Sequence, residues 1–77
     1  MMTLLDAAPG NTYRVEGLDL PLELSRRLEA LGMIQDGQVT VLRKKRRGAM
    51  IITVRGTRFA VGYSIAGHIT VKGAGAA

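Results

Sequence analysis

The chain has 77 residues, 47% of them hydrophobic, and its 11 Lys and Arg against 6 Asp and Glu give a formal net charge of +5. This length allows one small domain with a modest core, and it is too short for a parallel sheet covered by helices. Because the chain has no cysteine, the composition excludes a disulfide framework, thiolate metal sites and cysteine nucleophiles.

The N-terminal residues Met1–Asp6 lack the basic and long apolar regions of a signal peptide. No apolar run approaches the roughly 18–20 residues of a membrane span. We therefore expect a cytoplasmic protein. Its excess of positive charge favours a partner of opposite charge, such as an acidic protein, a nucleic acid or an anionic membrane surface.

The chain opens with a turn and a strand. Pro and Gly are strong turn formers, so a turn is expected at Pro9-Gly10-Asn11. In residues 12–18, Val15 alternates with the charged Arg14 and Glu16. This alternation predicts a half-buried β-strand.

One amphipathic helix is predicted over residues 21–31, followed by Gly32 in the left-handed position that ends many helices. Asp19 can cap its start, and Pro21 suits the first turn because its missing N–H costs nothing there. Leu22 and Met33 lie off the main leucine stripe and either dock a partner or fill the core. Leucines at steps of four, four and three residues form that stripe, namely Leu20, Leu24, Leu28 and Leu31.

Short strand-like segments follow in quick succession, with Gly48 and Gly56 at two tight connections. Residues 64–67 are expected to form a short turn or a single 3₁₀ turn. Short strands with closely spaced turns favour a small closed barrel, since closure removes exposed edges. The predicted class is therefore mainly β, with five strands and one helix inserted after the first strand. The later strands are residues 38–46, 49–55, 57–63 and 68–72.

We expect one domain over residues 1–72. Residues 73–77 contain only Gly and Ala, and this composition is typical of a flexible tail.

The sequence offers no convincing catalytic or metal site. His68 is the sole histidine, and the six carboxylates are scattered without metal-ligand spacing. Ser64 lies four residues before His68, a spacing that is common by chance, and no Gly-Lys-Ser or Gly-Lys-Thr phosphate loop occurs. We therefore expect no catalytic residue, no metal ligand and no cofactor, and a chain that is not an enzyme.

Five consecutive basic residues, Arg43–Arg47, are the strongest surface feature. On a strand, Arg43, Lys45 and Arg47 would form one row and Lys44 and Arg46 the other. One row could continue the core-facing register and project past the end of the barrel. The run is either an electrostatic site for an acidic protein, lipid headgroups or RNA, or a solvated hairpin tip that protects a strand edge.

RNA binding is the main rival to protein binding. Small basic barrels bind RNA through cations together with exposed aromatic side chains that stack on bases. Only Tyr13, Phe59 and Tyr63 are available, and Phe59 at least is expected in the core. The stacking platform is therefore poor.

The segment after the first predicted strand reads Arg26-Arg27-Leu28-Glu29-Ala30-Leu31-Gly32-Met33, and Gly37 and Val39 follow it. Residues 15–18 are Val-Glu-Gly-Leu, and residues 66–71 are Ala-Gly-His-Ile-Thr-Val. In order and spacing, these segments resemble the ferrous iron transport protein A (FeoA) family. The resemblance covers roughly residues 4–71, and the C-terminal domains of some metal-dependent repressors are similar in fold.

The resemblance implies an SH3-like five-stranded barrel that serves bacterial ferrous iron uptake. Such an accessory protein would bind the cytosolic G-protein part of a FeoB-type transporter and touch the membrane only indirectly, through that transporter. Self-association stays open, and the alternative is a small basic SH3-like barrel that binds RNA or another acidic partner. The family supplies no catalytic or metal-binding residues to carry over. The partner contacts that we expect are Arg26, Arg27, Arg43, Lys44, Lys45, Arg46 and Arg47.

Overall fold

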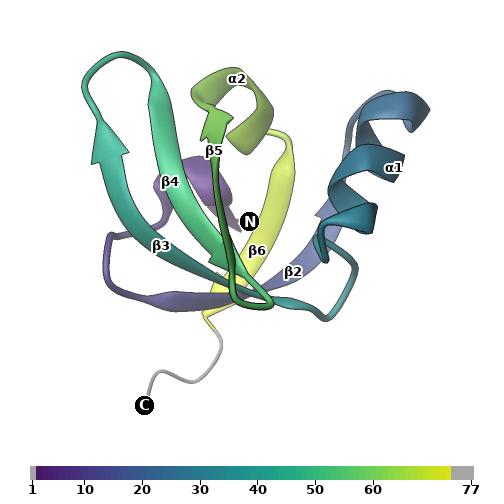
Figure 1. Cartoon of the computed structure of the whole chain (residues 1–77), viewed down its shortest axis with the longest axis horizontal. Coiled ribbons are helices and arrows are strands. Elements are labelled where there is room, and N and C mark those ends of the chain that lie inside the picture. Colours follow the sequence, from purple (N-terminus) through teal and green to yellow (C-terminus); the bar gives the residue numbers. More distant parts are fainter. Residues whose placement is uncertain (1, 74–77) are drawn as a thin grey trace.

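A single antiparallel sheet curls around the core in the computed structural model, which describes residues 2–73. Its strand order is β1-β6-β2-β3-β4-β5, and α1 stands beside it (Figure 1). The strands are β1 (Met2–Thr3), β2 (Thr12–Leu18), β3 (Gln38–Lys45), β4 (Ala49–Val54), β5 (Thr57–Gly62) and β6 (Ile69–Gly73). The helices are the 3₁₀ turn η1 (Leu4–Asp6), α1 (Leu22–Ala30) and α2 (Tyr63–Ala66).

The mainly β class and all five predicted strands are confirmed, with the one long helix placed after the first predicted strand. The additional strand β1 escaped prediction because two residues are too few to show alternation. It exists through its pairing with β6, where Met2 lies opposite Val71. The segment 64–67, expected to be a short turn or a single 3₁₀ turn, is the four-residue α-helix α2, which begins at Tyr63.

The barrel is completed by helices, whereas the sequence led us to expect a closed ladder of strands. Within residues 2–73 the sheet has two edges, β1 and β5. The helix α2 contacts both β5 and η1, and η1 contacts β6. These two short helices therefore cover the gap between the edge strands β1 and β5, where direct pairing of those two strands would have closed the barrel.

Two β-bulges bend the sheet. The register between β2 and β6 shifts between Val15 and Gly17, and the register between β3 and β4 shifts between Val41 and Arg43. An extra residue on one strand bends that strand and increases its local twist. The sequence signals for strands do not show these bulges, because alternation on either side of them looks normal.

The two predicted glycine connections are confirmed. Arg55 and Gly56 have φ angles of 52° and 81° and join β4 to β5 in a two-residue loop. Positive φ at both positions is the signature of a type I′ turn, whose twist matches that of the strands. The β3–β4 connection is longer: Lys45 pairs with Ala49, and Gly48 adopts a φ of 85°.

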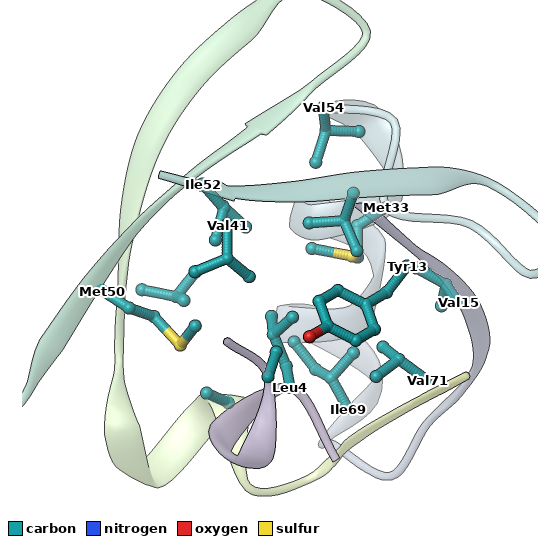
Figure 2. Packing of buried hydrophobic residues seen from close by; sticks show 14 of the residues in the cluster. Leu4, Tyr13, Val15, Met33, Val41, Met50, Ile52, Val54, Ile69 and Val71 are labelled. Carbon is teal, nitrogen blue, oxygen red and sulfur yellow. The ribbon is translucent and has the colours of Figure 1, made fainter. Parts of the chain in front are cut away.

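The core is aliphatic, as the composition requires, and Leu4 from η1 enters it from the side opposite Val41 and Ile52 (Figure 2). Tyr13 is buried at its rim, and its hydroxyl oxygen accepts a hydrogen bond from the Ala8 N–H at 2.8 Å. Phe59 was expected in the core but is only partly buried at its border. The fully buried large side chains are Leu4, Met33, Met50, Ile52, Ile69, Val15, Val39, Val41, Val54 and Val71.

The predicted stop of α1 is confirmed, but its start is different. Gly32 follows the helix with a φ of 105°. Pro21, and not Asp19, occupies the N-cap position, and no side chain caps the helix there. Asp19 lies too early because its backbone N–H donates to the His68 carbonyl at 2.8 Å, which holds it beside β6.

The apolar residues that are buried around α1 are not the ones that the leucine stripe predicted. Met33 is fully buried, whereas Leu22 is 66% exposed. Leu28 is buried, but Leu31, expected on the buried stripe, is 41% exposed. Leu31 is exposed because the helix ends there. The chain turns at Gly32, and Met33 therefore occupies the core position that was expected for Leu31.

Gly73, which the sequence placed at the start of the tail, is the last residue of β6 and pairs with Tyr13. The rest of the expected tail, residues 74–77, lies outside the described residues. Among the helices of residues 2–73, none has the length and apolar character to cross a membrane.

Candidate partner-binding surfaces

The five consecutive cations lie at the tip of the β3–β4 hairpin, and we call residues Arg43–Arg47 the basic hairpin. Arg43, Lys44 and Lys45 end β3, whereas Arg46 and Arg47 lie in the loop that leads to Gly48. The predicted alternation of the cations between two rows therefore applies only to the three that lie in β3. The continuation of the rows into the loop is wrong, because the chain leaves the strand after Lys45.

The bulge in β3 decides which of these cations faces the core side. Val41 is buried opposite Ile52, and beyond the bulge Lys44 lies opposite the buried Met50. Lys44 thus takes the core-facing row, past the end of the core, and its Nζ donates to the Leu5 carbonyl at 2.7 Å. Of the predicted row Lys44 and Arg46, only Lys44 lies on the core-facing side of the strand, where it ties the hairpin to η1.

The remaining strand cations point outward. Arg43 lies opposite Ile51, and Lys45 lies opposite Ala49. The hairpin is held in place from behind by α2: the Tyr63 hydroxyl donates to the Lys45 carbonyl at 2.7 Å, and the Tyr63 N–H donates to the Gly48 carbonyl at 2.7 Å. The cations are therefore carried on an anchored loop.

The charge of the basic hairpin is uncompensated. Residues 38–62, which span β3, β4 and β5, carry seven Lys and Arg and no Asp or Glu, whereas five of the six carboxylates lie in residues 16–36. The ion pairs within residues 2–73 are Asp19–His68 and Glu16–Lys72, both at 3.9 Å and exposed. Neither pair involves the hairpin, whose five side chains are all exposed.

The second candidate surface is on α1, and we call Leu22, Arg26, Arg27 and Leu31 the helix face. Leu22 and Arg26 are four residues apart, as are Arg27 and Leu31, so each leucine neighbours an arginine on the helix surface. All four are exposed, and α1 buries only Ser25 and Leu28. Because Leu22 and Leu31 are nine residues apart, they lie on opposite sides of the exposed half of the helix. The helix face therefore consists of two separate leucine–arginine pairs, and the exposure of Leu31 is the part that the sequence did not predict.

The structure does not bring the seven predicted contact residues together. The helix α1 lies at the right of Figure 1, and the tip of the β3–β4 hairpin lies at the upper left, away from it. Arg26 and Arg27 therefore belong to one surface and Arg43–Arg47 to another. The sequence expectation of a single set of contacts becomes two separate surfaces.

The polar residues considered for chemistry are dispersed. His68 has its Nδ1 at 3.9 Å from the Asp19 carboxylate, and both side chains are largely exposed. The buried Ser25 donates its hydroxyl to the Leu20 carbonyl at 3.3 Å. Within the described range no three His, Asp or Glu side chains gather in one place.

The described aromatic side chains make a poor stacking platform. Tyr13 is buried, and Phe59 and Tyr63 are half-buried at the border of the core. The Tyr63 hydroxyl is also occupied by the Lys45 carbonyl. The side chains that would stack on RNA bases are thus already used in packing.

Comparison with known proteins gives a family and several similar structures. The family model of the FeoA domain matches residues 2–73. An iron uptake regulatory protein (FeoA) is 28% identical, with a TM-score of 0.83 over 92% of this chain and 95% of that one. The FeoA of Stenotrophomonas maltophilia, solved with zinc and described as a prokaryotic SH3 domain protein, is 30% identical, with a TM-score of 0.78 over 94% and 91%. No curated protein sequence matches the chain.

A metal-dependent repressor is similar in fold alone. A manganese-dependent transcriptional repressor is 21% identical, with a TM-score of 0.83 over 92% of this chain and 36% of that chain. The similarity is confined to about a third of the repressor. The family match, by contrast, spans nearly the whole described chain, and its neighbours share the SH3-like fold. The chain therefore belongs to the FeoA family, which is associated with ferrous iron transport.

Proposed function

We propose that this chain is a non-enzymatic accessory protein of bacterial ferrous iron uptake, and that it binds the cytosolic G-protein part of a FeoB-type membrane transporter. Its family supports this role, as does the similar S. maltophilia protein, which is described as a candidate activating factor of bacterial ferrous iron transport. A cytoplasmic location follows from such a partner.

The observation that carries the proposal is the helix face. Leu22, the first residue of α1, is 66% exposed, and Leu31, the residue that follows the helix, is 41% exposed. Arginine is enriched at protein interfaces, whereas lysine is depleted there. The cations of the helix face are arginines, Arg26 and Arg27, and each has an exposed leucine beside it.

The proposed mechanism is a shift between transporter states. A docked domain stabilises one state only by its difference in affinity for the two states. The helix face would bind one nucleotide state of the G-protein domain more tightly than the other. Binding of guanine nucleotide and binding of this chain would then be coupled reciprocally.

Calorimetric titration of this protein against the cytosolic domain of the ferrous transporter tests the proposal. The titration is run without nucleotide, with GDP and with a non-hydrolysable GTP analogue. We expect saturable binding whose affinity differs between these conditions. The absence of binding in all three, with the protein folded by circular dichroism, would contradict the proposed partner.

Matched variants locate the contact. Leu22→Ala with Arg26→Gln changes the helix face, and Arg46→Gln with Arg47→Gln changes two exposed loop cations on the other surface. We expect the first variant to weaken binding and the second to leave it nearly unchanged at moderate salt. The opposite result would move the transporter contact to the basic hairpin.

A further inference from the structure

We propose that the basic hairpin is a membrane-surface site that binds anionic lipid headgroups. The inference goes beyond the proposed docking on a transporter, since it gives the domain a direct contact with the bilayer. It rests on the charge, the shape and an apolar neighbour of residues 43–47, and not on the identity of any protein partner.

The positive charge of the basic hairpin is not neutralised by neighbouring residues. The five cations have no carboxylate within ion-pair distance, and none occurs anywhere in residues 38–62. Five adjacent like charges repel one another, so a diffuse negative surface lowers their energy more than a single counter-charge would. Each Lys or Arg near an anionic bilayer strengthens binding by roughly fivefold.

The outward face of the basic hairpin is flanked mostly by short side chains. Beside the outward Arg43 and Lys45, neighbouring strands present mainly small residues. Lys45 pairs with Ala49 on β4, which in turn pairs with Gly62 on β5. Arg43 lies opposite Ile51 on β4, which in turn pairs with Ala60 on β5. No long side chain from β5 stands in front of these cations, so a flat layer of headgroups can approach them.

An exposed leucine also borders the outward cations. Leu42 directly precedes Arg43 and is 41% exposed at the bulge. Apolar side chains beside a basic cluster are typical of proteins that lie on a membrane interface.

The same features argue against other anionic partners. An RNA site would need stacking aromatics, but Tyr13 is buried and Tyr63 is tied to the hairpin backbone. At a protein interface the fully buried core is apolar, and lysine is depleted there while arginine is enriched. Five consecutive exposed cations bordered by one exposed leucine, Leu42, do not supply an apolar core of this kind. Binding to a layer of lipid headgroups requires neither aromatic stacking nor an apolar interface core.

The test is cosedimentation of the full chain with vesicles of equal parts phosphatidylglycerol and phosphatidylethanolamine. Vesicles of phosphatidylcholine and phosphatidylethanolamine serve as the uncharged control. We expect binding to the first at 50 mM salt, loss of that binding near 500 mM salt because of screening, and no binding to the second. A short single-stranded RNA is titrated in parallel.

Two variants with equal net charge separate a local site from general basicity. The hairpin variant is Arg43→Gln, Lys45→Gln, Arg46→Gln and Arg47→Gln, and it spares Lys44 because that side chain bonds to η1. The control variant removes four exposed cations elsewhere, namely by Arg14→Gln, Arg26→Gln, Arg27→Gln and Lys72→Gln.

We expect the hairpin variant to lose vesicle affinity by two orders of magnitude or more, since four cations at about fivefold each are removed. The control variant should lose less than tenfold. Equal losses in both variants would overturn the local site. Absence of vesicle binding by the folded wild type, or hairpin-dependent binding of RNA without vesicle binding, would overturn the lipid assignment.

The experiment contains no transporter, so its outcome is independent of the proposed partner. Vesicle binding without transporter binding would leave the membrane site standing and remove the accessory role. Transporter binding without vesicle binding would do the reverse.

Discussion

The helix face and the basic hairpin are both cationic and exposed, but their surroundings differ. On α1, Arg26 and Arg27 share the helix with Glu23 and Glu29 and lie beside exposed leucines. On the hairpin, the cations are consecutive and have no acidic neighbour in residues 38–62. The residues that surround a charged cluster, more than the number of its charges, therefore indicate the kind of partner.

The two regions are also held differently. The hairpin continues a strand ladder whose inner row is fully buried, and Tyr63 and Lys44 anchor its tip. The helix α1 is held at its end, where Leu28 and Met33 enter the core and Gly32 makes the turn. Substitutions should therefore affect stability and binding separately in the two regions.

The largest expected effect is at the base of the hairpin. Met50→Ala should lower the free energy of unfolding by about 2–5 kcal/mol, because a fully buried side chain leaves a cavity. Leu22→Ala on the helix face should change it by only about 0.5 kcal/mol or less. Urea denaturation of both variants makes this comparison. Similar losses would mean that Leu22 packs in solution and is not free to dock a partner.

The second expected effect concerns the turn that ends α1. A Cβ on Gly32 would lie 2.9 Å from Val54 Cγ1, at a φ of 105°. Gly32→Ala should therefore cost about 2–4 kcal/mol, from backbone strain together with overpacking. Gly56→Ala has a similar φ of 81° but open space around the Cβ, so it should cost only about 1–2 kcal/mol. Thermal unfolding of both variants measures the difference, and equal costs would contradict a packed helix end.

The third effect is on binding. Leu22→Ala with Arg26→Gln should weaken transporter binding by about 1–2 kcal/mol, or roughly 5–30-fold, as for moderate anchors at an interface. Because both residues are exposed, the unfolding midpoint should stay almost unchanged. Calorimetry and a denaturation curve on the same sample separate the two quantities. An affinity equal to that of the wild type would remove the helix face from the contact.

The smallest expected effect tests whether Tyr63 anchors the hairpin. Tyr63→Phe removes the hydroxyl that donates to the Lys45 carbonyl, and it should cost about 1 kcal/mol or less because the bond is partly solvated. Amide exchange should become faster at residues 45–48 and stay unchanged in α1. Uniformly faster exchange would indicate global destabilisation and no specific anchor.

Local sequence signals predicted most of the elements in this chain. Alternation at Val15 and leucine spacing in α1 placed a strand and a helix, and Gly48 and Gly56 placed two turns. These signals are local because each depends on the residue itself and a few neighbours in sequence. The two-residue strand β1 had no such signal, since it depends on pairing with β6.

The candidate surfaces were predicted less completely than the fold. The sequence identified the cations but grouped Arg26 and Arg27 with Arg43–Arg47, because residue type carries no information about distance in space. It also assigned Leu31 to the buried stripe, although the turn at Gly32 lets Met33 fill the core instead. Residues at the end of an element follow the packing of the next segment as well as their own periodicity.

By itself, the sequence determined the class of the fold, the turns, the absence of cysteine chemistry and the concentration of positive charge in residues 43–47. The physical reason is that propensity, periodicity and composition act within short windows. The tertiary structure alone decided that the bulge at Val41–Arg43 turns Lys44 inward and leaves Arg43 and Lys45 outside. It also placed α1 and the tip of the hairpin in different parts of the molecule (Figure 1). Both outcomes depend on pairing and closure between distant segments, which no local pattern encodes.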